Sequence, residues 1–431
     1  MRAKRGLSAA LTAGVAVMAL AGSVGASSAM AEAKPGHCKG KNIHGEGSSL
    51  QKIAQEVWTG KLGGVGFNVN AEGCKNAGEK PEVTYSPNGS GAGLESWNAN
   101  GGAKEPAKSG NEFIGTDEPP TLAQLENIDK AAKGTGGKGQ AVVIPVAQAA
   151  VAVIVNPPVA KCVTQISNAN LQKVWNGELN NWETLAAACG NHKITRVARL
   201  DGSGTSYVQK TYLNEINNAA LCDKKTWKEL AAPAENTVWP EASVAGCPAT
   251  LSALVKPAGK GGGEEAKKVA ETEGAIGYAN LSDARNQAVV KNYTWLALEN
   301  VKTAEFEFPG TAAGEPSKAA AASANCAKTK YTGLPTEAEA EKADANWSKV
   351  NGAHPKENEK YPICTLTYDV ALVNYELAGY TEPGKAGQTA LDYLQYVTAE
   401  KGGQTDYENR DYRKVEEAVA KRASKAAAIV G

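Results

Sequence analysis

Histidine is scarce in this sequence, with four residues in 431, and no two of its eight cysteines are spaced as C-x2-C. Because zinc sites are built from closely spaced cysteines and histidines, this pattern argues against a zinc-binding protein. Beyond residue 21, no segment approaches the ~18 consecutive apolar residues that a membrane-spanning helix requires. We therefore expect neither a bound metal nor a membrane span in the mature protein.

The first 31 residues have the order of a secretory signal peptide. Three basic residues in the first five positions are followed by an apolar stretch from Leu7 to Ala21 and by an A-x-A sequence that ends at Ala31. This order predicts export and cleavage after Ala31, with a membrane anchor as the alternative. The first cysteine, Cys38, does not follow the cleavage position directly, so we expect no lipid anchor. The predicted location is secreted, periplasmic or at the cell surface.

Neither sign of charge dominates the mature chain. Without the three basic residues of the signal segment it has 43 Lys and Arg against 46 Asp and Glu, a net charge of −3. Such a balance does not predict nucleic acid or an anionic membrane surface as a partner.

All eight cysteines follow the signal segment. An even number of cysteines in an exported chain favours disulfides, here four. We interpret the spacing as sequential pairing, because that connectivity closes local loops. The cysteines are Cys38, Cys74, Cys162, Cys189, Cys222, Cys247, Cys326 and Cys364.

Strand-like and helix-like segments alternate along the chain, which is typical of an α/β fold. The Val-rich run from Ala149 to Val155 predicts a buried strand, and residues 416–429 predict an amphipathic helix. The charged run from Pro335 to Lys360 indicates a solvated helical face and not a binding site. About 400 mature residues are more than one core usually organises, so we expect two domains.

Three segments share one local design, in which a Gly-Ser turn leads directly into a helix. They are residues 45–49, 88–91 and 201–206. Glycine lets the backbone approach a ligand, and Ser or Thr at a helix start places a hydroxyl beside unpaired N–H groups. N-capping explains each turn taken alone. Three such turns in one α/β chain indicate an anion site, because strand-to-helix turns gather at the carboxyl ends of strands.

Two charged residues sharpen this prediction. Arg199 precedes the third turn, where its planar guanidinium could hold an oxyanion through two hydrogen bonds. Asp117 follows the strand-like segment 113–116, and a turn or cap residue is the alternative interpretation. A serine hydrolase using Ser90 or Ser203 is disfavoured, because neither serine lies in G-x-S-x-G and four histidines leave few candidate bases.

With these features the sequence resembles the phosphate-binding proteins of ABC phosphate importers, the PstS-like members of the periplasmic-binding-protein superfamily. The resemblance runs from about residue 42 to the C-terminus, and its most specific motifs are RLDGSGTS and GAIGY. The family commonly has Thr-Phe-Pro where this chain has Ser49, Leu50 and Gln51, so either Ser48 or Ser49 could supply the hydroxyl. The motifs, in the family's order, are GEGSSL at 45–50, residues 85–91, residues 113–117, LQKVWNGELNNW at 171–182, RLDGSGTS at 199–206 and GAIGY at 274–278.

The resemblance implies an α/β, two-lobed periplasmic-binding-protein fold (type II-like) with two chain crossings at the hinge. The expected first lobe comprises residues 32–147 plus 362–431, and the second comprises residues 148–361. Phosphate would bind between the lobes. The implied phosphate-binding residues are Ser49, Leu50 through its N–H, Ser90 and Asp117 in the first lobe, and Arg199, Ser203, Gly204 and Thr205 in the second.

The implied function is capture of inorganic phosphate and delivery to the membrane permease of an ABC importer, by a monomer that is not an enzyme and needs no cofactor. Asp117 would be the only acceptor among donors. It would accept the proton that phosphate keeps near neutral pH, and sulfate offers no such proton. A binder of another oxyanion, such as sulfate or molybdate, and a surface or sensing protein that retains the fold are the alternatives.

Overall fold

The computed structural model describes most of the chain beyond the predicted signal peptide. Residues 35–431 form one compact unit. The signal segment, residues 1–31, lies outside the described residues. The structure describes residues 37–71, 74, 77–78, 80–134, 139–156, 161–217, 219–221, 226–230, 237–240, 254–285, 294–311 and 323–431.

The longest strand is encoded by a nearly continuous apolar run. β4 spans Ala141–Val155, and all of its residues are buried, as expected for a strand covered on both faces. The strand predicted from Ala149 to Val155 is confirmed, and it continues further toward the N-terminus. Pro145 lies within β4 and lacks a backbone N–H, and the pairing of β4 with β11 (Cys364–Leu372) shifts register beside it.

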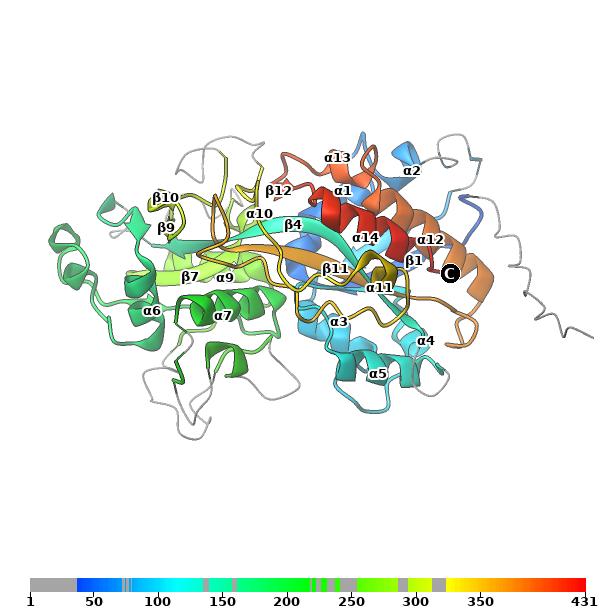
Figure 1. Ribbon diagram of the computed structural model, residues 1–431, viewed down its shortest axis with the longest axis horizontal. Coiled ribbons are helices and arrows are strands. Elements are labelled where there is room, and N and C mark those ends of the chain that lie inside the picture. The colour runs from blue at the N-terminus through cyan, green and yellow to red at the C-terminus, as the bar shows by residue number, and fades with distance from the viewer. Residues whose placement is uncertain are drawn as a thin grey trace, which may run out of the picture. The chain divides into compact units, whose positions relative to one another are not determined.

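β4 and β11 lie in the middle of a large mixed sheet (Figure 1). Within the described residues the strand order is β2-β1-β3-β11-β4-β7-β6, and β8 and β12 also pair with β4. β1 is parallel to both β2 and β3, and β11 is antiparallel to β3 and β4. The remaining strands of this sheet are β1 (Ile43–Gly47), β2 (Val83–Ser86), β3 (Phe113–Thr116), β6 (Thr195–Arg196), β7 (Ala275–Asn280), β8 (Thr294–Trp295) and β12 (Tyr412–Arg413).

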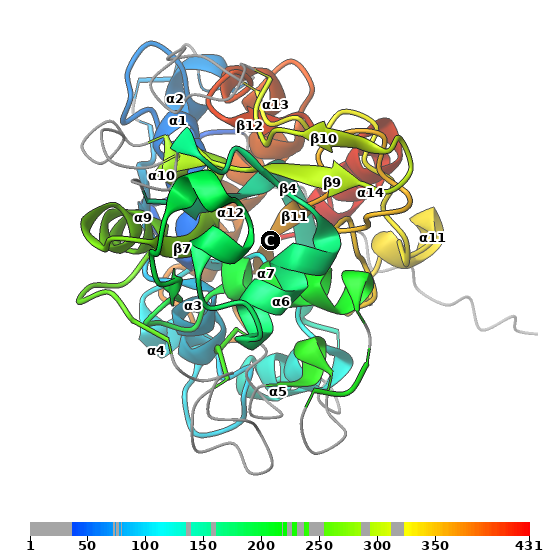
Figure 2. The same cartoon turned by 90° about the vertical axis from the view of Figure 1, so that its left-hand side faces the viewer.

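Helices cover the sheet, and a small sheet of β5 (Gln165–Ile166), β9 (Ala297–Asn300) and β10 (Glu305–Glu307) lies beside it (Figures 1 and 2). In the described part of the chain, every helix is too short or too polar to cross a bilayer. The α-helices are α1 (Lys52–Trp58), α2 (Phe67–Asn70), α3 (Ser90–Ser96), α4 (Pro106–Ser109), α5 (Leu122–Ala131), α6 (Asn168–Asn176), α7 (Gly204–Ile216), α9 (Gly262–Glu271), α10 (Leu281–Ala284), α11 (Glu337–Ala340), α12 (Pro383–Thr398), α13 (Gly403–Asp406) and α14 (Glu417–Ala427), and short 3-10 turns include η1 (Ser49–Gln51).

The buried apolar side chains form two separate cores. The first unites β1, β2 and β3 with α1, α12 and α14, and the second unites β7 with α6, α7 and α9. The cores meet on β4 between Ala149 and Ala150, and on β11 between Cys364 and Leu366. The α/β, two-lobed architecture is thus confirmed, with two strands shared between the lobes. The lobe bounds at 147/148 and 361/362 stay a prediction.

The charged run from Pro335 to Lys360 differs from its prediction. Within this run, helix forms only at α11, where Thr336 caps the first turn. Elsewhere, α14 is the amphipathic C-terminal helix that was expected. Beyond α11, Trp347 is fully buried in the first core, and its ring centroid lies 5.8 Å from that of Tyr368. The prediction of a solvated helix was therefore wrong for the rest of the run, because Trp347 and smaller residues such as Ala345 and Val350 are buried in the first core among the charged residues.

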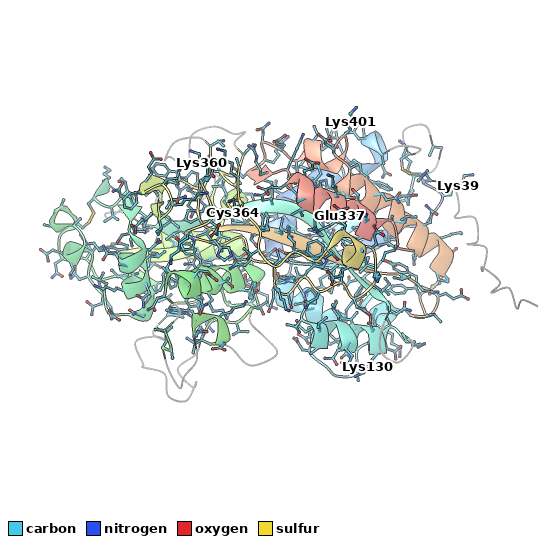
Figure 3. The ribbon with its side chains drawn as sticks, in the orientation of Figure 1. Lys39, Lys130, Glu337, Lys360, Cys364 and Lys401 are labelled. Atoms are coloured by element: carbon cyan, nitrogen blue, oxygen red, sulfur yellow. A yellow bond between two sulfur atoms is a disulfide. The ribbon has the colours of Figure 1, made fainter. Side chains whose placement is uncertain are left out.

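Six of the eight cysteines lie in described residues and form three disulfides. Cys38 pairs with Cys74, Cys162 with Cys189, and Cys326 with Cys364 at the start of β11 (Figure 3). These bonds confirm sequential pairing for the six cysteines. Cys222 and Cys247, the fourth expected pair, lie outside the described residues.

Candidate functional site

Three neighbouring strands of the first lobe deliver polar side chains to one edge of the sheet. Ser48 follows β1, Ser90 begins α3 after β2, and Asp117 follows β3. Because β1 lies between β2 and β3 and is parallel to both, the carboxyl ends of all three strands are adjacent. The Ser48 hydroxyl donates to Asp117 Oδ1 at 2.5 Å, and the Asp117 N–H donates to Ser90 Oγ at 3.2 Å.

The two serines of the first turn have different partners. Residues 45–47, predicted as a turn, continue strand β1, so that prediction was wrong and the turn begins at Ser48. Ser48 Oγ accepts the N–H of Leu50 at 3.1 Å, which engages the N–H that was assigned to the ligand. Ser49 Oγ accepts the N–H of Gly262 at 3.3 Å, from the first residue of α9 in the second lobe.

The second lobe supplies the start of α7. Ser203 is the N-cap of this 13-residue helix, and its Oγ accepts the N–H of Ser206 at 3.4 Å. The next two residues reach the first lobe. Thr205 donates to Asp117 Oδ2 at 3.4 Å, and a Cβ on Gly204 would lie 2.6 Å from Asp117 Cβ. Only glycine at position 204 allows this approach.

Arg199 is buried, with 2% of the residue exposed, and is held by a residue that the sequence analysis treated only as part of a turn. Its Nε donates to Asp201 Oδ1 at 2.9 Å and its Nη2 donates to Oδ2 at 2.5 Å. Nη1 is also buried and has no hydrogen-bond partner among the described residues. The signal for the Asp201 pair was present in RLDGSGTS, where the aspartate stands two positions after the arginine.

Two further acids, which the sequence analysis did not single out, lie near Arg199. Burial raises the pKa of Asp283 to about 6 and raises that of Glu265 well above its ordinary value, while the Arg199 charge lowers both in part. Glu265 Oε1 accepts the N–H of Tyr278, from the GAIGY motif, at 3.2 Å. The Tyr278 hydroxyl lies 2.6 Å from Ser206 Oγ, so this motif supports the first turn of α7.

Asp117, a buried residue that is 2% exposed, is an acceptor at the centre of the site. Burial raises its pKa, and hydrogen bonds from Ser48, Thr367 and Thr205 together with the Arg199 charge oppose the rise. Thr367 was missed by the sequence analysis, because nothing in the mostly apolar run of β11 marks it. It donates to Asp117 Oδ1 at 2.7 Å.

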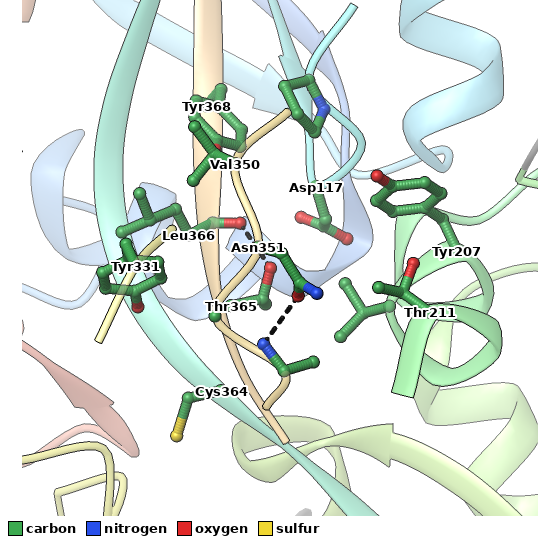
Figure 4. Close-up of a pocket in the computed structure, with 14 residues that line it drawn as sticks. Asp117, Tyr207, Thr211, Tyr331, Val350, Asn351, Cys364, Thr365, Leu366 and Tyr368 are labelled. Carbon is green, nitrogen blue, oxygen red and sulfur yellow. Dashed lines mark hydrogen bonds between the residues drawn. The ribbon is translucent and has the colours of Figure 1, made fainter. Parts of the chain in front are cut away.

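A pocket lies beside Asp117, and its lining includes neither Arg199 nor the predicted residues at the start of α7. Figure 4 shows Tyr207 and Thr211 of α7 on one wall and Thr365 of β11 on the other, with Asp117 drawn between them. Asn351, from the segment after α11, also lines this pocket and donates to Glu215 of α7 at 3.1 Å.

The structure thus brings the predicted residues of both lobes together in one buried region. Hydroxyl groups, the Arg199 guanidinium and the start of α7 are donors, and Asp117 is an acceptor among them. Asp201, Glu265 and Asp283 add carboxyl groups near Arg199. This arrangement suits a small oxyanion that carries a proton. The eight predicted residues, all buried, are Ser49, Leu50, Ser90, Asp117, Arg199, Ser203, Gly204 and Thr205.

Two α/β lobes that share two strands, with facing polar turns, define the two-lobed fold of periplasmic binding proteins. Residues 39–422 match the family described as PBP superfamily domain, so the chain belongs to the PBP superfamily. No curated protein matches its sequence.

Solved structures of phosphate-binding proteins share the fold at low sequence identity. A phosphate-binding protein from Stenotrophomonas maltophilia is 17% identical with a TM-score of 0.60. A high-affinity periplasmic phosphate-binding protein (PfluDING) bound with phosphate is 18% identical with a TM-score of 0.58, and a human phosphate binding apolipoprotein is 17% identical with a TM-score of 0.56. Each alignment covers 88% of this chain and 92% of the other. Membership of the PBP superfamily, which the motifs implied, is confirmed by the family match, and these structures share the fold.

Proposed function

We propose that this chain is an extracytoplasmic binding protein that captures inorganic phosphate between its lobes and delivers it to the membrane permease of an ABC importer. It acts as a monomer and binds without catalysis. Membership of the PBP superfamily and the fold shared with phosphate-binding proteins support this proposal. The predicted signal peptide and the three disulfides support export.

One observation, the nitrogen of Arg199 left unpaired within the described residues, favours an anion as the ligand. Arg199 is buried, Asp201 satisfies two of its three nitrogens, and Nη1 has no partner among the described residues. A buried cationic donor without an acceptor is costly. An oxyanion in contact with Nη1 would remove that cost, and the N-terminus of α7, which begins just after Arg199, would add favourable N–H groups.

The carboxylate of Asp117 favours phosphate over sulfate as the ligand. A carboxylate beside a bound anion is repulsive unless the anion donates a proton to it. Near neutral pH phosphate can donate this proton and sulfate cannot. A site built around a required hydrogen bond can reject the analogue that lacks it by ~10⁴ or more.

The identity of the ligand can be tested by purifying the protein without added phosphate, denaturing it and measuring the phosphate that is released. We expect about one phosphate per chain to be released, because tight binders carry ligand through purification. Ligand-free protein should then bind phosphate in the presence of excess sulfate. Failure to bind phosphate at all would refute the proposal, and equal competition by sulfate would favour a general oxyanion binder.

A further inference from the structure

A buried chain of hydrogen bonds crosses the first lobe and ends on Asp117. The Tyr393 hydroxyl donates to Gln55 Oε1 at 2.6 Å, and Gln55 Nε2 donates to Gln51 Oε1 at 2.9 Å. Gln51 Nε2 donates to Thr367 Oγ1 at 2.8 Å, and Thr367 donates to Asp117 Oδ1 at 2.7 Å. The chain therefore links α12, α1, η1 and β11 to the end of β3.

One backbone carbonyl fixes the direction of this chain. Gln51 Nε2 also donates to the carbonyl oxygen of Tyr368 at 3.0 Å. A carbonyl oxygen can only accept, so the amide NH₂ of Gln51 must face β11, and its Oε1 must face Gln55. Gln55 then presents its own NH₂ to Gln51 and its Oε1 to Tyr393. Every donor in the chain points toward Asp117.

The orientation of the Thr367 hydroxyl follows from this direction. Its oxygen accepts from Gln51, so its single proton is available for one acceptor. Asp117 Oδ1 lies at 2.7 Å and the carbonyl oxygen of Thr116 at 3.3 Å, which makes Asp117 the main acceptor.

The two carboxylate oxygens of Asp117 consequently differ. Oδ1 accepts from Ser48 at 2.5 Å and from Thr367 at 2.7 Å, both in the first lobe. Ser48 Oγ already accepts the N–H of Leu50, so its proton is also directed to Asp117. Among the described residues Oδ2 has one donor, Thr205 of the second lobe, at the longer distance of 3.4 Å.

We propose that Thr367 and Gln51 are positioning residues, which hold Asp117 through Oδ1 and keep Oδ2 free to accept the proton of the bound anion. This inference rests on the proposed function and names the side chains behind its selectivity. Asp117 cannot rotate without losing both Oδ1 donors. Because those donors favour the ionised carboxylate, Asp117 enters the site as an acceptor.

Other charged and titratable groups lie around Asp117, and they differ in how they affect pKa values in the site. The Arg199 charge lowers the pKa of Asp117, whereas the Asp117 charge raises the pKa of Asp283. Tyr85 and Tyr368, also close to Asp117, have raised pKa values from burial and stay neutral. Loss of the Thr367 donor leaves the burial cost of Asp117 less opposed, so its pKa rises and the carboxylate becomes protonated at a higher pH.

Thr367→Val tests this role, with Thr365→Val as the matched control. Thr365 lies two positions earlier on β11, lines the pocket of Figure 4 and donates only to the carbonyl oxygen of Leu366. Calorimetry of phosphate and sulfate, on both sides of the second phosphate ionisation, should show at least about tenfold weaker phosphate binding for Thr367→Val, with a loss that grows as the pH falls. The phosphate-to-sulfate preference should fall in parallel, and Thr367→Ser and Thr365→Val should resemble the wild type.

If a folded Thr367→Val variant keeps the wild-type ratio of phosphate to sulfate affinity at every pH, the positioning role is wrong. The proposal that the protein binds phosphate would still stand. A wild type that binds no phosphate would instead refute the proposed function. If Thr367→Val does not fold, Gln51→Met decides in its place, because it removes the NH₂ that orients the Thr367 hydroxyl. An unchanged ratio in Gln51→Met would then also overturn the inference.

Discussion

The backbone N–H of Gly91 donates a 3.0 Å hydrogen bond to the carbonyl oxygen of Gly202, and so joins the Gly-Ser turns of the two lobes. Beside this contact, Gly89 has a φ of 105°, and a Cβ there would lie 2.4 Å from Asp201 Oδ2. The glycines of these turns therefore let the lobes touch around the site.

Gly204→Ala should weaken phosphate binding because it separates the lobes. The added Cβ would lie 2.6 Å from both Asp117 Cβ and Ser90 Oγ, and overpacking of this kind costs about 1–3 kcal/mol. Gly263→Ala on α9 is the control, because its Cβ would meet nothing closer than Asp283 Oδ1 at 3.8 Å. Calorimetry should show about tenfold or greater loss of phosphate affinity for Gly204→Ala but not for Gly263→Ala. Wild-type affinity in Gly204→Ala would show that this contact is not part of the bound state.

Arg199→Ala should abolish most phosphate binding while the fold is retained. Removal of a charged partner from a buried site costs on the order of 2–5 kcal/mol. Arg199→Lys should recover only part of the loss, because an ammonium cannot reproduce the planar fork that Asp201 now holds. Arg422→Ala on α14, where Arg422 bonds Pro335, is the control. Unchanged affinity in Arg199→Ala would remove Arg199 from the site.

Asp117→Asn should lower selectivity more than phosphate affinity. An amide can present an N–H to an oxyanion and no longer repels sulfate. If Asp117 only capped a turn, the variant would lose thermal stability and keep its preference for phosphate. Calorimetry with both anions separates these cases, and an unaltered phosphate-to-sulfate ratio in folded protein contradicts the proton-acceptor role.

Asp369 should make the protein less stable as the pH rises. It is fully buried on β11, and burial raises its pKa to about 8, with Gln51 and Gln55 opposing the rise in part. The folded state therefore holds a proton that the unfolded state releases above its ordinary pKa of 3.8. The resulting stability is complete below about pH 4 and is lost as the pH rises through about 8.

Asp369→Asn removes this titration, so the variant should gain stability over the wild type as the pH rises from about 4 to 8. The gain should reach on the order of a few kcal/mol in the free energy of unfolding. Denaturant unfolding of both proteins across this range is the measurement. A difference between them that does not change with pH would show that Asp369 does not bind the proton.

The parts of the site that local sequence encodes were predictable. Arg199 and Ser203 share one turn, and Asp117 directly follows its strand, so each residue's type and neighbours indicated its place. Thr367 was not predictable, because it is 250 positions from Asp117 in sequence and only the pairing of β11 with β3 brings them together.

Sequence patterns predicted the fold better than they predicted its exceptions. The apolar run of β4 and the period of α14 are repeated signals, whereas the buried residues of the charged run, such as Ala345, Trp347 and Val350, are separated by polar ones. The first turn was misplaced for a related reason: glycines at 45 and 47 indicate a turn, but pairing with β2 and β3 on either side keeps them in strand β1.

The most direct test of the account is a calorimetric titration of phosphate into ligand-free wild-type protein, repeated in excess sulfate. We expect one phosphate to bind per chain, with an affinity that sulfate barely changes, because only phosphate brings a proton for Asp117. Absence of binding, or an affinity reduced by sulfate as strongly as by added phosphate, would contradict the account.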